Sequence, residues 1–173
     1  PSFWSSAEWA VQMVGPTGMN FNFSDNSETV ALSPLISAWF TRELGRRDLL
    51  WSRRAIFNGT SSVPGSSELP AFLVVAKDLD FTSAIPSPAT TFRVYGGPQS
   101  VALMRTSFTD PDATFVGIKG GIPGYPHSHM DVGSFVLDSN GERWVSDLGA
   151  ESYPAAEANL GGFWNYAQDS QRW

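Results

Sequence analysis

The spacing of hydrophobic residues changes from helical to strand-like near residues 80–88, and this change restricts the possible folds most. Before it, apolar residues recur at helical spacing, as in the segment from Leu35 to Leu44. After it, short segments alternate with a period of two. We therefore predict an α+β fold, with a mainly helical segment over residues 1–84 and an antiparallel β-domain over residues 85–173.

The first part has start and stop signals for several helices. Ser33-Pro34 is a cap followed by proline at the first helical position, and Gly45 is a typical helix end. Residues 67–76 have a helix start signal, but their β-branched content leaves a strand as the alternative. The remaining polar, Gly- and Pro-rich stretches, including residues 16–32, are predicted to be loops. Helices are expected over 5–14, 33–45, 48–57 and 67–76.

The second part is predicted to be a set of short strands joined by turns. Asn140-Gly141 is the strongest turn signal, because Asn-Gly favours a two-residue hairpin. It should join two neighbouring antiparallel strands. Strands are expected over 91–95, 101–106, 113–119, 132–138 and 142–147.

Composition excludes several classes of protein. The chain has 173 residues, 42% of them hydrophobic, and a net charge of -6, which argues against a nucleic-acid partner. No apolar run reaches the roughly 18 residues that a membrane span needs. The absence of cysteine excludes disulfides and thiolate chemistry. Seven tryptophans offer stacking surfaces for sugars, although most should be core residues.

The only two histidines of the chain are two residues apart, at His127 and His129. In an extended segment these side chains and that of Asp131 share one face, so they could converge on a metal or a substrate. The predicted hairpin also brings Asp147 back toward His129, and a His/Asp pair suits Zn²⁺. Two ligands are too few for a zinc site, so a hydrogen-bonded pair of loop histidines is the alternative.

Three ordered motifs between residues 115 and 153 resemble the heparinase II/III-like family of polysaccharide lyases. They are Gly117-Ile118-Lys119-Gly120-Gly121, then His127-Ser128-His129-Met130-Asp131-Val132-Gly133-Ser134-Phe135, then Trp144-Val145-Ser146-Asp147-Leu148-Gly149 with Tyr153. Members of that family have an α/α toroid followed by antiparallel sheets. The resemblance implies that the helical segment is the end of a toroid and that the β-domain is part of a β-sandwich.

The resemblance also implies roles for single residues. His127 would be the catalytic histidine that faces the substrate, and His129 and Asp147 would be ligands of a structural zinc ion. A third zinc ligand and a catalytic tyrosine would lie outside this chain, so we expect the 173-residue chain alone to be inactive. Asp131 would either orient an imidazole or bind the metal directly.

The implied reaction is β-elimination on a uronic-acid polysaccharide. A base removes the C5 proton, the C4–O bond breaks, and the carboxylate must be neutralised as charge develops. His127 would serve either in neutralisation or in proton transfer. The enzyme would be periplasmic or secreted by a bacterium.

Two other classes of protein stay open at this point. One is a carbohydrate-binding β-domain without catalysis, in which Trp164, Asn165 and Tyr166 contact a sugar. The other is a metal-dependent glycan hydrolase that uses both histidines and Asp147 around an activated water. We further expect both ends of the chain to lie within a longer polypeptide. Association with further copies of the same chain, as a homo-oligomer, is the alternative.

Overall fold

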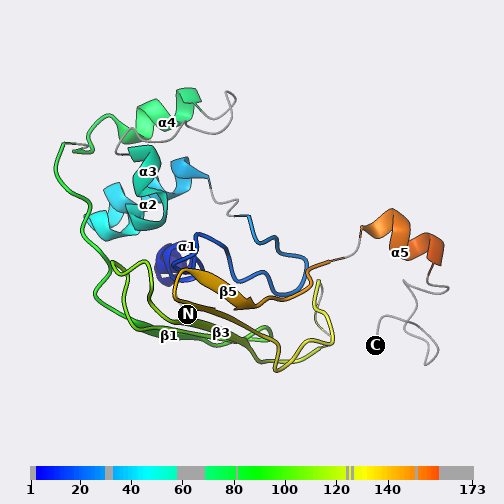
Figure 1. Cartoon of the computed structure of the whole chain (residues 1–173). Helices are drawn as coiled ribbons and strands as arrows, with labels where there is room; N and C mark the ends of the chain where they lie inside the picture. The colour runs from blue at the N-terminus through cyan, green and yellow to red at the C-terminus, as the bar shows by residue number, and fades with distance from the viewer. Residues whose placement is uncertain are drawn as a thin grey trace. The chain divides into compact units, whose positions relative to one another are not determined.

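The computed structural model describes residues 3–29, 33–57, 69–80, 82–123, 125, 127–150 and 152–159. The chain forms two compact units. The helical unit comprises Pro1–Val14 and Ala31–Thr91, and the sheet unit comprises Gly15–Val30 and Phe92–Trp173. Figure 1 shows the helices and strands of both units. A few helices together with an antiparallel sheet confirm the predicted α+β fold.

The helical unit consists of short helices around a small apolar core. Ser33 caps α2 by accepting a hydrogen bond from the Leu35 amide, and Gly45 ends this helix in a left-handed conformation, as predicted. Residues 69–76 are helical, which excludes the strand alternative for this stretch. The core contains Ala38, Leu50, Phe57, Ala76 and Ile85. The helices are η1 (Phe3–Glu8), α1 (Trp9–Gln12), α2 (Pro34–Leu44), η2 (Arg47–Arg53), α3 (Arg54–Phe57) and α4 (Leu69–Ala76).

The described part of the sheet unit contains five antiparallel strands, and each strand pairs with its neighbour in sequence. Asn140 and Gly141 form the tip of the last hairpin with positive φ at both positions, which confirms the predicted turn. The strands are β1 (Phe92–Tyr95), β2 (Val101–Arg105), β3 (Phe115–Lys119), β4 (Phe135–Ser139) and β5 (Glu142–Val145), and α5 (Tyr153–Asn159) follows them.

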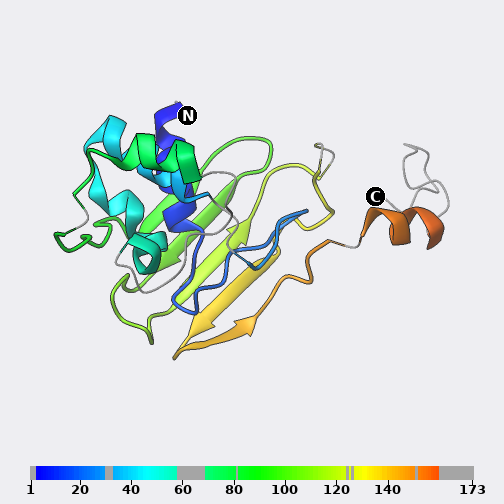
Figure 2. The ribbon, with the colours of Figure 1, turned by 90° about the horizontal axis from the view of Figure 1, so that it is seen from above.

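The loop predicted over residues 16–32 is described as far as residue 29, and this part belongs to the sheet unit and packs on one face of the sheet (Figure 2). Phe21 and Phe23 are buried, and their rings contact each other with centroids 5.1 Å apart. Phe21 lies on Gly117 of β3, where an added Cβ would be 2.5 Å from the Phe21 ring. Glycine at this position therefore lets the loop approach the sheet.

The opposite face of the sheet carries a row of apolar side chains across its first four strands. Strand register places Val94, Ala102, Ile118 and Phe135 in this row, and all four are exposed or half-buried. An apolar sheet face of this kind is what a β-sandwich requires of each of its sheets. The sandwich and the toroid remain predictions. Within the described residues, no helix has the length and apolar character to cross a membrane.

Candidate functional site

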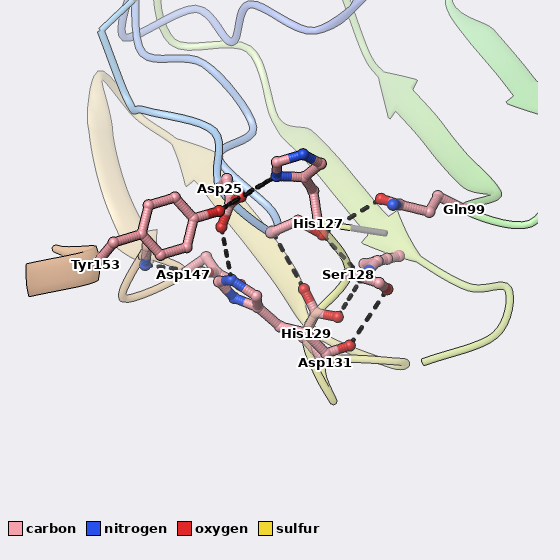
Figure 3. Close-up of polar contacts among 11 residues, drawn as sticks. Asp25, Gln99, His127, Ser128, His129, Asp131, Asp147 and Tyr153 are labelled. Atoms are coloured by element: carbon pink, nitrogen blue, oxygen red, sulfur yellow. Dashed lines mark hydrogen bonds and ion pairs between the residues drawn. The ribbon is translucent and has the colours of Figure 1, made fainter. Parts of the chain in front are cut away.

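The two histidines meet at a carboxylate that is about a hundred positions earlier in the chain (Figure 3). His127 Nδ1 lies 2.6 Å from Asp25 Oδ2, and His129 Nε2 lies 3.1 Å from Asp25 Oδ1. The Tyr153 hydroxyl donates to Asp25 Oδ2 over 2.6 Å and lies 3.2 Å from His127 Nδ1. We call Asp25, His127, His129 and Tyr153 the Asp25 cluster. All four belong to the sheet unit.

Asp25 is ionised at neutral pH. Partial burial is the largest single effect and acts to raise its pKa, but hydrogen bonds from Tyr153, His127 and His129 together outweigh it. The pKa of Asp25 is therefore lower than that of an ordinary aspartate. An ionised carboxylate only accepts hydrogen bonds, so both imidazoles must direct an N–H group toward it.

This requirement defines the tautomer of each neutral histidine. His127 carries its proton on Nδ1, which leaves the Nε2 lone pair available, and Nε2 has no hydrogen-bond partner among the described residues. The His127 side chain is 72% exposed, so a solute can reach it. By the same reasoning His129 carries its proton on Nε2. An accessible imidazole oriented by a carboxylate is suited to proton transfer.

Backbone strain is also found at this cluster. Among the described residues other than glycine, Ser24, His127 and Asn140 have positive φ. Asn140 is explained by the hairpin turn, whereas Ser24 precedes Asp25 and His127 belongs to the cluster. Strained backbone of this kind costs about 1–3 kcal/mol and is found preferentially at functional sites.

Asp131 does not join the histidines, contrary to the expectation that all three side chains share one face. Its carboxylate instead forms an ion pair with Lys119 and accepts a hydrogen bond from the Ser24 amide over 3.2 Å. Asp131 therefore makes no direct hydrogen bond to either imidazole.

The physical reason is that residues 127–131 do not form a strand and begin in a turn. The Ser128 amide donates to the Tyr125 carbonyl over 2.9 Å, and His127 has a φ of 58°. The strand predicted from residue 132 begins only at Phe135. The two-residue periodicity of an extended chain therefore does not apply to this segment.

Asp147 lies beside the start of β4. Its Oδ2 accepts from the Ser134 hydroxyl over 2.6 Å, and its Oδ1 accepts from the Gly149 amide over 2.9 Å. The sharing of a cation between Asp147 and His129 stays a prediction.

The described residues do not make a zinc site by themselves. A protein zinc site uses three or four ligands, and no group of three or more His, Asp or Glu side chains in the described part of the chain is arranged to hold a metal. His129 Nε2 is also engaged with Asp25. A zinc site at His129 and Asp147 would therefore need at least one further donor.

Sequence reasoning missed Asp25, and it assigned no role to Lys119 or Tyr153. A signal for Asp25 existed in the alternation Asn20-Phe21-Asn22-Phe23-Ser24-Asp25, which is typical of a segment with one buried face. Tyr153 belongs to the family motif, but nothing near it in sequence indicates that it reaches a histidine. The expected sugar contacts at Trp164, Asn165 and Tyr166 lie outside the described residues.

The fold and the cluster together define an α+β protein with an accessible His-Asp-Tyr group suited to acid–base chemistry. Residues 100–167 match the family described as Heparinase II/III-like, C-terminal. The match includes His127, His129, Asp147 and Tyr153, whereas Asp25 lies before it. No curated protein matches the sequence.

Proposed function

We propose that the chain is part of a polysaccharide lyase that cleaves uronic-acid-containing polysaccharides by β-elimination. The family match supports this proposal. The observation that carries it is the exposed His127, whose Nδ1 lies 2.6 Å from the ionised Asp25. We also propose a location in the periplasm or outside the cell, where such polymers are found.

In this proposal His127 Nε2 accepts the C5 proton of the uronic acid. The C5–H electrons form the C4–C5 double bond, the C4–O bond breaks, and the leaving oxygen takes up a proton from solvent water. Asp25 keeps the Nδ1 proton of His127 in place and stabilises the imidazolium that forms, because its negative charge is close. The Tyr153 hydroxyl, 3.2 Å from His127 Nδ1, donates its one proton to Asp25, so its oxygen can accept a hydrogen bond from a sugar hydroxyl.

The test measures the product of the complete enzyme on alginate, heparin-like and chondroitin-like polymers. Elimination creates a C4–C5 double bond, so we expect ultraviolet absorbance to rise together with new chain ends. New ends without absorbance would contradict the lyase and favour the metal-dependent hydrolase. Binding without any cleavage would favour the carbohydrate-binding domain.

We further propose that His129 and Asp147 contribute to a zinc site whose role is structural. Zinc at about 100 times its dissociation constant would then stabilise the folded protein by about 2.7 kcal/mol. His129→Ala should abolish this stabilisation, because a ligand is lost. His127→Ala is the matched control and should retain it. Thermal unfolding with and without zinc gives the result, and a wild-type protein that zinc does not stabilise would contradict the proposal.

A further inference from the structure

A buried lysine contacts the two loops that carry Asp25 and the two histidines. The Lys119 side chain, on β3, is 0% exposed, and that of its ion-pair partner Asp131 is 13% exposed. Lys119 Nζ also donates to Ser24 Oγ over 3.0 Å and to Ser128 Oγ over 3.2 Å. A buried charge is costly unless it is paired and hydrogen-bonded, and Lys119 meets both conditions.

Each partner of Lys119 is next to, or two residues from, a member of the Asp25 cluster. Ser24 directly precedes Asp25, and Ser128 lies between His127 and His129. Asp131 closes the network, because it binds Lys119 with one oxygen and the Ser24 amide with the other. Lys119 and Asp131 thus connect the loop that carries the carboxylate to the loop that carries the imidazoles.

We propose that Lys119 and Asp131 are positioning residues, which hold the Asp25 carboxylate within hydrogen-bonding distance of His127 and His129. Their hydrogen bonds go to the residues beside the cluster, Ser24 and Ser128, so they act through the two loops. Their catalytic importance rests on the proposed lyase function, but the geometric claim can be tested without any substrate.

The sheet contains a second buried ion pair that serves as a matched control. Arg143 Nε lies 2.7 Å from Asp138 Oδ1, with side chains 4% and 0% exposed. Arg143 also binds the carbonyls of Asn20 and Met19, which are not adjacent to the cluster. Loss of either pair should affect the stability of the fold, but only loss of the Lys119 pair should displace the imidazoles.

The experiment compares the double variants Lys119→Met/Asp131→Asn and Arg143→Met/Asp138→Asn. Each removes both charges, so neither member of the pair is left as an unpaired buried charge that prevents folding. The chain has only two histidines, so a long-range ¹H–¹⁵N spectrum of the metal-free protein at one pH contains two imidazole systems. Asp25→Ala gives the reference spectrum for imidazoles that have lost the carboxylate.

We expect both imidazole signals of Lys119→Met/Asp131→Asn to move most of the way to their positions in Asp25→Ala. The control variant should keep the wild-type positions. Wild-type imidazole signals in a folded Lys119→Met/Asp131→Asn variant would overturn the proposal. Equal displacement in both double variants would also overturn it, because it would indicate general loosening.

A second measurement uses the complete enzyme. We expect kcat of Lys119→Met/Asp131→Asn to fall by about 10²-fold with little change in KM, since small displacements of reacting groups reduce the rate to this extent. Displaced imidazoles with unchanged kcat would show that the positioning does not serve catalysis. If the wild-type enzyme does not cleave these polymers, the proposed function is wrong. The spectra still test whether Lys119 and Asp131 position Asp25 and the imidazoles.

Discussion

His127→Ala is expected to lower the elimination rate of the complete enzyme by about 10²–10⁴-fold, the usual contribution of a general acid–base group. The reason is that His127 combines an exposed side chain, an available Nε2 and a carboxylate at Nδ1. Because the side chain is 72% exposed, its removal should leave the thermal midpoint nearly unchanged. Ultraviolet absorbance of the unsaturated product gives the rate.

The control for this variant is Glu142→Gln, an exposed position on the last hairpin, which should keep wild-type activity. A His127→Ala enzyme with wild-type kcat would show that the proton acceptor is another group. Loss of activity together with loss of the fold would contradict the claim that His127 contributes little to stability.

Arg143→Met is expected to lower the free energy of unfolding by about 3–5 kcal/mol, because it leaves the Asp138 carboxylate buried without its hydrogen-bonded cation. Asp138 is fully buried, and it keeps a hydrogen bond from the Thr17 hydroxyl over 2.6 Å. Arg143 also donates to the Asn20 carbonyl over 2.7 Å, so the variant loses a contact to the covering loop as well. Urea unfolding followed by circular dichroism measures the change.

Arg42→Met is the control, because Arg42 pairs with Glu43 over 2.8 Å while both side chains are about one-third exposed. An exposed pair contributes about 0–1 kcal/mol, so this variant should unfold almost as the wild type does. If the two substitutions lowered the free energy of unfolding equally, burial would not control how much the Arg143–Asp138 pair contributes to stability.

Local signals in the sequence were sufficient for most of the secondary structure. Ser33 and Gly45 delimit α2 through contacts within a few residues, and Asn140-Gly141 reverses the chain through its own backbone preference. The strands followed from period-two alternation, which depends on one buried face. Such features can be predicted because their causes are near in sequence.

The functional cluster depended on contacts that are distant in sequence. The sequence by itself determined that the chain has two histidines, a nearby aspartate and a family motif around them. Only the tertiary structure decided that Asp25 meets the histidines and that Asp131 turns away to Lys119. The physical reason is twofold. The loop over residues 15–29 packs on a strand that is distant from it in sequence, and a turn closed by the Ser128 amide and the Tyr125 carbonyl interrupts the extended chain at His127, so the i, i+2, i+4 rule does not hold there.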